Sequence, residues 1–279
     1  MRNPTSPNSS AIQTQGFAIL PKAFSQQQVQ QLNQALSFAF SLCQDNVWIQ
    51  YRAGQIFAAR NILQIFPQID HWWRRPLIVQ TLTDVLGKEF GLVRVLYFDK
   101  PPGQSWALPW HKDRTLAVQE NHLASNYFQH PTKKAGVKHV EADQRILNEM
   151  LTLRIHLDAV TDANGPLLVI PGSHLEPLLW DQMLSENATS RMGASTSNEA
   201  LEHVVPETIY ANVGDVLAMR PHLTHCSGNS DPHTDKHRRI LHLEFAANQQ
   251  LPDGYQWNHW LSLRTQANQQ PETVCGGSA

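Results

Sequence analysis

The segment from Met150 to Asp158, MLTLRIHLD, constrains the fold more than any other part of the chain. Apolar and polar residues alternate strictly along it, which is typical of a β-strand with one buried face. One face carries Leu151, Leu153, Ile155 and Leu157, and the other carries Thr152, Arg154, His156 and Asp158. We therefore expect a strand with an apolar face and a polar face, within a sheet.

Further short strands are expected on both sides of this segment. The candidates are apolar runs bounded by turn residues, at residues 16–20, 92–98, 167–170, 213–219 and 239–245. The expected helices cluster in the first third of the chain: one begins after an N-cap at Ser25 and another runs from Pro76 to Leu86. This pattern indicates a mainly β (α+β) protein, with a double-sheet β barrel packed on helices.

The chain has no internal repeat and no linker that marks a second domain. Residues 1–14 are polar and are interpreted as a disordered tail, and residues 15–279 as a single domain. Two polar stretches, 120–150 and 180–200, lack a strong period and are expected to shape a substrate pocket. The first is expected to be a loop with a short helix near residues 143–150. It is either a functional lid or a mobile loop that has no role.

Charge and hydropathy exclude several classes of partner. The net charge of −2 provides no electrostatic footprint for nucleic acid or for an anionic membrane. The polar start shows no secretory signal, and no apolar run is long enough to span a bilayer. We expect a cytoplasmic protein that binds neither nucleic acid nor a membrane; its oligomeric state is left open.

His111 and Asp113 are two residues apart in the run LPWHKDR. In an extended segment such residues point to the same side, so the imidazole and the carboxylate would lie together. A second, distant histidine would complete a facial triad of two histidines and one carboxylate, which binds Fe(II) and leaves positions open for ligands. His222 and His225 are the two candidates for this second histidine.

Two adjacent arginines follow at 238 and 239, and a guanidinium there can bind a carboxylate bidentately. Arg239 shares its strand face with the apolar Leu241 and Leu243, whereas Arg238 shares the more polar face with His242. Alternation therefore favours Arg238. Ser227, two residues beyond His225, would lie on the histidine's face and could bind the same carboxylate.

Four stretches, in this order, resemble the phytanoyl-CoA dioxygenase-like family of Fe(II)/2-oxoglutarate-dependent oxygenases. They are residues 98–113 with PWHKD, 164–174 with NGPLLVIPGSH, 214–225 with GDVLAMRP and the later histidine, and 238–245 with RRILHLEF. The resemblance covers roughly residues 90–247. It implies a double-stranded β-helix (jelly roll, cupin-like) with N-terminal helices packed on the outer sheet.

The resemblance also implies the roles of particular residues. Fe(II) would be held by His111, Asp113 and His225, which favours His225 over His222. Arg238 would bind the far carboxylate of 2-oxoglutarate, with Ser227 in support and with Thr152 and Arg154 lining the pocket. Relatives often have an aromatic residue where Arg154 stands, so this departure points to an anionic group on the substrate.

The implied reaction uses O2 and 2-oxoglutarate, releases succinate and CO2, and hydroxylates a small organic substrate that the sequence does not identify. Asp113 favours hydroxylation, because halogenating relatives lack this carboxylate. One alternative is a catalytically inactive cupin-like protein that binds a metal or ligand, against which Arg238 argues. The other is a zinc hydrolase with the same three ligands, but the chain has no H-E-x-x-H motif.

Overall fold

Strand β9 (Met150–His156) lies inside the largest sheet, with antiparallel partners on both sides. The computed structural model describes residues 6–44, 46–176, 180–181 and 205–263. The order across the large sheet is β1 (Phe17–Leu20), β12 (Val216–Met219), β9, β14 (Ile240–Ala246), β4 (Gly91–Phe98), β3 (Gln55–Ala59) and β2 (Ile49–Arg52), and β15 (Leu261–Ser262) also pairs with β4. The strand expected from the alternating sequence is confirmed.

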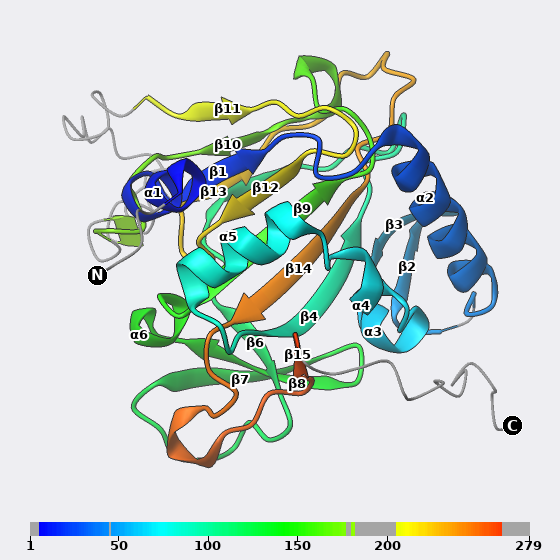
Figure 1. Ribbon diagram of the computed structural model, residues 1–279. Coiled ribbons are helices and arrows are strands. Elements are labelled where there is room, and N and C mark those ends of the chain that lie inside the picture. The colour runs from blue at the N-terminus through cyan, green and yellow to red at the C-terminus, as the bar shows by residue number, and fades with distance from the viewer. Residues whose placement is uncertain (1–5, 45, 177–179, 182–204, 264–279) are drawn as a thin grey trace, which may run out of the picture.

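A second, smaller sheet has the order β11 (Glu207–Ile209), β10 (Leu167–Val169), β13 (His225–Ser227) and β5 (Leu108–His111). Its neighbouring strands are all antiparallel. Two antiparallel sheets with few helices form the double-sheet jelly roll. The predicted mainly β fold class is therefore confirmed (Figure 1).

Helices α2 (Gln26–Ser41) and α5 (Pro76–Leu86) cover one face of the large sheet (Figure 1). Leu32 of α2 and Leu82 of α5 join Leu153 and Leu241 of the sheet in one buried core. Each such leucine stabilises the fold by about 1.5–3 kcal/mol through burial. Both helices were expected from the sequence; α2 begins with a capping box at Ser25. The short helices α3 (Ile62–Ile65) and α4 (Ile69–Trp72) precede α5.

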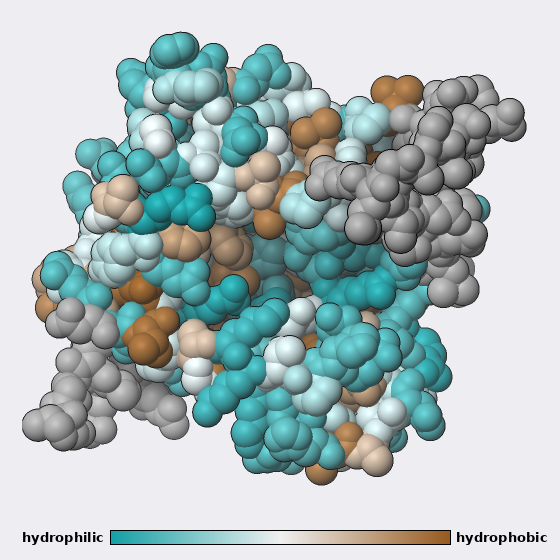
Figure 2. All heavy atoms as spheres, turned by 180° about the vertical axis from the view of Figure 1, so that it is seen from behind, coloured by the Kyte–Doolittle hydropathy of each residue, from teal (hydrophilic) through white to brown (hydrophobic). Residues whose placement is uncertain are grey.

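The other face of the large sheet is polar and yet buried. Arg154 and His156 of β9 and His242 and Glu244 of β14 are each at most 9% exposed. Polar groups between two sheets cost free energy unless they find partners, so this face marks the place for a site. Figure 2 views the molecule from the side away from α2 and α5, and shows a hollow near the middle of that side.

Residues 115–142 contain a third sheet, so the loop expected within residues 120–150 is wrong. Its order is β6 (Thr115–Val118), β8 (Val137–Ala142) and β7 (Phe128–Lys134). Phe128 and Val140 pack in a separate small core, whereas most of β7 is exposed and polar. The sequence therefore lacks the regular alternation of a half-buried strand. The short helix expected near residues 143–150 is present as α6 (Gln144–Leu147).

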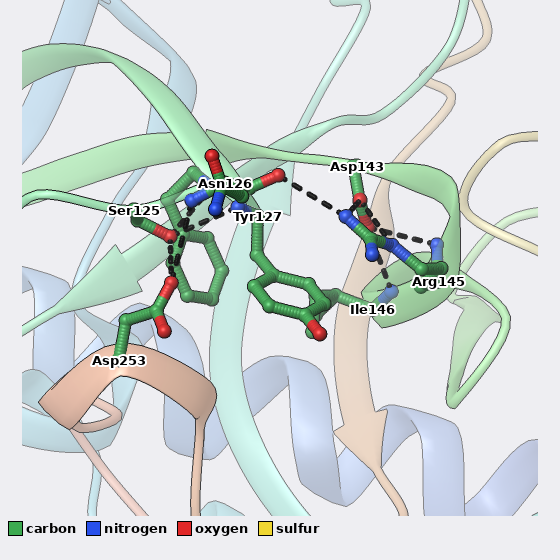
Figure 3. A network of polar contacts seen from close by, with 8 residues as sticks. Ser125, Asn126, Tyr127, Asp143, Arg145, Ile146 and Asp253 are labelled. Carbon is green, nitrogen blue, oxygen red and sulfur yellow. Dashed lines mark hydrogen bonds and ion pairs between the residues drawn. The ribbon is translucent and has the colours of Figure 1, made fainter.

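A polar network holds the base of the β7–β8 hairpin (Figure 3). Asp253, in the 3-10 helix η2 (Pro252–Gly254), accepts hydrogen bonds from Ser125 Oγ at 2.6 Å and from Asn126 N at 3.3 Å. Arg145 bonds to Asp143 and to the carbonyl of Asn126, and its guanidinium lies 4.0 Å from the centre of the Tyr127 ring. The segment before β7 is thus tied to two other parts of the chain.

Residues 7–14 form helix α1 (Pro7–Thr14), so the expected disordered tail is wrong for this stretch. Ser6 caps the helix, and Ile12 is fully buried in the main core. A single buried apolar residue in a polar segment is too weak a pattern to predict a helix. Residues 1–5 of the expected tail, and residues 182–200 of the second polar stretch, lie outside the described residues. No described helix has the length and apolar character needed to cross a bilayer.

Candidate active site

His111 and His225 face each other across strands β5 and β13. They are direct cross-strand partners, and their ring centroids are 4.3 Å apart. The register then shifts, because Ser227 pairs with Leu108. Such a bulge redirects side chains and is common beside active sites.

Asp113 completes the group and lies two residues after His111, the last residue of β5. Its backbone N–H donates to the carbonyl of Pro221 at 2.9 Å, which ties it to the turn before β13. Its two carboxylate oxygens lie 3.9 Å from His111 Nε2 and 3.6 Å from His225 Nε2. Within the described part of the chain, these three residues are the one group of His, Cys, Asp or Glu side chains placed to bind a metal ion, with ligand atoms within 4.8 Å of one another.

The backbone sets the tautomer of both histidines. His111 Nδ1 lies 2.7 Å from the carbonyl of Pro109, and His225 Nδ1 lies 2.8 Å from the carbonyl of Leu223. A carbonyl only accepts, so each Nδ1 carries the proton and each Nε2 presents its lone pair beside Asp113. Two imidazole nitrogens and one carboxylate oxygen form the donor set that non-haem Fe(II) prefers. The residues therefore fit an Fe(II) ion.

The charges of the group also suit a metal. Burial lowers the pKa of His225 to about 4, so the imidazole is neutral at pH 7. Burial alone would raise the pKa of Asp113, but its neighbours, His225 foremost, hold that pKa well below its usual range. A neutral imidazole and an ionised carboxylate are the forms that bind metal ions.

A cavity of about 70 Å³ lies between the sheets beside this group. Besides the group itself, its lining includes Arg94, Leu96, Phe98, Trp106, Leu108, Arg154, Leu167, Ser227, Arg238, His242 and Glu244. The set combines apolar side chains with four kinds of polar group. A small cavity with a few convergent polar groups is the usual form of a small-molecule site.

One end of the cavity is built for an anion. Arg238 is 3% exposed; its Nη1 donates to the carbonyl of Gly165 at 2.8 Å, and its Nε is buried without a hydrogen-bond partner. Lys100 is fully buried, and its Nζ donates to Ser227 Oγ at 3.1 Å. Burial lowers the pKa of Arg238 to about 9 and that of Lys100 to about 6. Neither side chain forms an ion pair with a carboxylate among the described residues. A bound carboxylate would therefore offset the free-energy cost of burying their charges.

The structure also separates the competing candidates. Arg239 forms a bidentate ion pair with Asp158, at 2.6 and 2.8 Å, and does not line the cavity. His222 is buried beside His174, with ring centroids 5.9 Å apart, and stands outside the metal group. The geometry therefore places Arg238 and His225, rather than their competitors, at the cavity.

The two residues predicted from β9 differ in their positions. Arg154 lines the cavity, forms no ion pair with a described carboxylate, and has a pKa that burial lowers to about 10. Thr152, two residues earlier on the same face, is not part of the lining, and its Oγ1 is buried without a hydrogen-bond partner. Arg154 thus lines the cavity as expected, whereas Thr152 does not.

Several polar groups at the cavity were not expected from the sequence. Arg94 Nε donates to Glu244 Oε2 at 2.8 Å, and His242 Nε2 lies 3.1 Å from Glu244 Oε1. Arg94, His242 and Glu244 are polar residues in otherwise apolar strands, and this pattern can be recognised in the sequence. Lys100 is not in the lining but donates a hydrogen bond to Ser227, which is. Its sequence signal was weaker, since it only follows the strand that ends at Phe98.

A model of the phytanoyl-CoA dioxygenase (PhyH) family matches residues 12–240. The chain belongs to this family. Two curated relatives are each 27% identical to it: L-proline trans-4-hydroxylase of Streptomyces griseoviridis, over 61% of this chain, and a probable alpha-ketoglutarate-dependent hypophosphite dioxygenase of Stutzerimonas stutzeri, over 65%. The alignments span 59% and 54% of the lengths of these relatives.

A solved relative shares the fold of this PhyH-family chain. The crystal structure of EctD from S. alaskensis with 2-oxoglutarate and 5-hydroxyectoine superposes with a TM-score of 0.61 at 19% identity. The match covers 87% of this chain and 76% of EctD. At this identity the likeness supports the jelly-roll architecture, and the chemistry depends on the site itself.

Proposed function

We propose that this chain is an Fe(II)- and 2-oxoglutarate-dependent dioxygenase that hydroxylates a small organic substrate. The observation that supports this proposal is a single cavity that connects a metal-binding triad with a buried anion site. The triad is His111, Asp113 and His225, and the anion site is Arg238, Lys100 and Ser227. The two curated relatives are named for proline and hypophosphite, which supports a small substrate.

Each group has a role that follows from its position. The triad would hold Fe(II), which together with 2-oxoglutarate and O2 supplies the oxidising chemistry when bound. Arg238 would bind the far carboxylate of 2-oxoglutarate through two parallel N–H donors, and Lys100 and Ser227 would add a charge and a hydroxyl. Arg154 would add positive charge between the metal triad and the anion site. The packed sheets around the cavity would exclude water from the reaction.

The same geometry weakens the two alternatives. An inactive metal-binding cupin would not need two buried, unpaired cations beside its metal, since their burial costs free energy. A zinc hydrolase needs a carboxylate free to act as a base. The nearest lining carboxylate other than Asp113 is Glu244, which forms an ion pair with Arg94.

Anaerobic titration with Fe(II) and 2-oxoglutarate tests the proposal directly. We expect a weak visible metal-to-ligand charge-transfer band that requires both additions, and release of succinate once O2 and a substrate are supplied. If 2-oxoglutarate does not bind to the Fe(II) protein, the oxygenase is excluded and the binding protein becomes the better explanation.

We further propose that the protein acts in the cytoplasm on a small molecule and O2, without a nucleic-acid or membrane partner. A net charge of −2 supports the lack of an electrostatic attraction to either polyanion. A requirement for Fe(II) and 2-oxoglutarate supports the location, because both are supplied inside cells.

Binding of 2-oxoglutarate is expected to take up a proton. With its pKa lowered to about 6, Lys100 is mostly neutral at pH 8, and a carboxylate beside it would raise that pKa again. Calorimetry at pH 8 in buffers of different ionisation enthalpy should therefore show uptake of up to one proton. Lys100→Met should abolish the uptake. A binding heat that is independent of the buffer would contradict this role for Lys100.

Lys100 should also affect stability as a function of pH. Its folded pKa is below its unfolded pKa of 10.5, so between about pH 6 and pH 10.5 the unfolded chain binds more protons. This residue's contribution to the free energy of unfolding therefore increases as the pH rises through that range. Denaturant unfolding of wild type and Lys100→Met at pH 7 and pH 9 measures how much more steeply the free energy of unfolding of wild type increases with pH.

Gly165→Ala is expected to reduce both stability and affinity for 2-oxoglutarate. Gly165 has φ +66°, and an added Cβ would lie 2.7 Å from the carbonyl oxygen of Gly228 and 3.1 Å from Lys100 Nζ. The backbone at the anion site would have to move. Gly103→Ala is the matched control, because Gly103 has φ +68° but nothing within 4 Å of its Cβ position. The control should lose about 1 kcal/mol of stability to backbone strain and keep its affinity.

A further inference from the structure

Positive charge gathers at the end of the cavity opposite Arg238. Glu244, in β14, is six residues beyond Arg238, roughly 20 Å along the backbone at the rise of an extended chain. Arg94 faces Glu244 across the strands and forms an ion pair with it. Both residues line the cavity, so its far end includes a charge pair that is neutral as a whole.

Arg60 brings a second guanidinium close to this end, near Arg94 and Glu244 but outside the residues that line the cavity. Ala58 of β3 pairs with Phe98 of β4, and Ala59 pairs with Tyr97, so residue 60 comes next to Leu96. Alternate residues face the same side of a sheet, which places Arg60 on the face of the cavity-lining Leu96 and Phe98. Burial lowers the pKa of Arg60, and the nearby charge of Arg94 lowers it further, while the charge of Glu244 partly opposes this.

The β7–β8 hairpin adds a lysine beside Arg60. Lys134 ends β7, and Ala135 and Gly136 form a two-residue turn with φ values of +49° and +81°. The carbonyl of Ala135 accepts a hydrogen bond of 3.2 Å from Asn61 Nδ2, which holds the tip of the hairpin next to residue 60. Burial lowers the pKa of Lys134, and the charges of Arg60 and Arg94 lower it further, while Glu141 and Asp113 partly oppose this.

The acidic groups near these cations are already engaged. Glu244 pairs with Arg94, and Glu141 pairs with His130 at 3.1 Å. Asp113 belongs to the metal triad. Arg60 and Lys134 therefore form no ion pair with any carboxylate that the structure describes. Two half-buried cations side by side repel each other, and a bound anion would reverse that cost.

We propose that the substrate presents an anionic group, a carboxylate or a phosphoryl group, to Arg60 and Lys134. This inference rests on the proposed function, in which Arg238 and Lys100 hold 2-oxoglutarate at the other end of the cavity. Arg60 can bind either anion with paired donors, and Lys134 adds a point charge. The two ends thus keep the co-substrate and the substrate apart, with the metal triad on the facing sheet.

Calorimetric titration of the anaerobic complex of the full chain with Fe(II) and 2-oxoglutarate tests the inference. The probes are inorganic phosphate, benzoate, and benzamide as the uncharged match of benzoate. We expect wild type to bind phosphate or benzoate more tightly than benzamide. Arg60→Gln and Lys134→Gln should each weaken binding of the anion by about tenfold or more, because each loses a charge-assisted hydrogen bond. Lys133→Gln, an exposed neighbour on the same hairpin, should bind as wild type does.

The charge-transfer band is recorded first in all four proteins, so that two kinds of failure are distinguished. If wild type forms no band, the proposed function fails and the inference falls with it. If the band forms, the inference alone is overturned when neither anion binds, when benzamide binds as tightly as benzoate, or when both variants keep full affinity. Loss of the band in Arg60→Gln or Lys134→Gln would assign these residues to 2-oxoglutarate and also overturn it. Binding of phosphate over benzoate, or the reverse, identifies the anionic group.

Discussion

His225→Ala is expected to abolish succinate release and to weaken Fe(II) binding by more than about 100-fold. His225 is one of three ligands, and loss of a partner outside the ligand set already costs about 10- to 100-fold in metal affinity. Its Nε2 lies 3.6 Å from Asp113, so the substitution also leaves that half-buried carboxylate with His111 as its one remaining partner in the triad. Anaerobic titration with Fe(II), followed by the visible band with 2-oxoglutarate, measures both losses.

His222→Ala is the matched control for this prediction. His222 is a buried histidine three residues away that also has the sequence context of a ligand, but it lies beside His174 rather than Asp113. The variant should form the band with unchanged intensity, although the small space it leaves will lower its melting temperature. An intact band in His225→Ala, together with a lost band in His222→Ala, would show that the triad is wrongly assigned.

The regular parts of the fold could be predicted because their side chains follow one period. Leu151, Leu153 and Ile155 alternate with polar residues in β9, and Leu32 and Leu36 recur at helical spacing in α2. The third sheet lacks such a signal. Five successive residues of β7, 129 to 133, are exposed, so the pairing of that strand depends on β8 and not on its own pattern. Helix α1 was missed for a similar reason, since Ile12 is its one fully buried apolar residue.

The site divides in the same way. His111 and Asp113 are two residues apart, so their meeting follows from local geometry, and the distant His225 came from a resemblance between motifs. Arg60 and Lys134 are 74 residues apart in the chain and meet through the register of β3 with β4 and a single hydrogen bond from Asn61. Neither has a local pattern that separates it from an exposed cation. Only the strand pairing could show that both lie close to Arg94, at one end of the cavity.

Arg238→Met is expected to raise the concentration of 2-oxoglutarate needed for half-saturation by about 30-fold or more. The guanidinium is buried near Lys100 and Ser227 and has no carboxylate ion-pair partner among the described residues, so its charge is available to the co-substrate. Removal of one partner from a buried, hydrogen-bonded charge pair costs about 2–5 kcal/mol, which is a factor of about 30 at the lower limit. Titration of the charge-transfer band with 2-oxoglutarate at fixed Fe(II) measures the change.

Arg239→Met, one residue along the chain, carries the same chemical change to the opposite face of the strand. There it breaks the ion pair with Asp158, whose partners are 33% and 19% exposed, so the loss of stability should be about 1 kcal/mol or less. Its affinity for 2-oxoglutarate should stay within about twofold of wild type. Alternation along a strand makes the pair decisive, because adjacent residues cannot face the same cavity. If Arg239→Met loses the band while Arg238→Met keeps it, the inner face of β14 has been assigned to the wrong side.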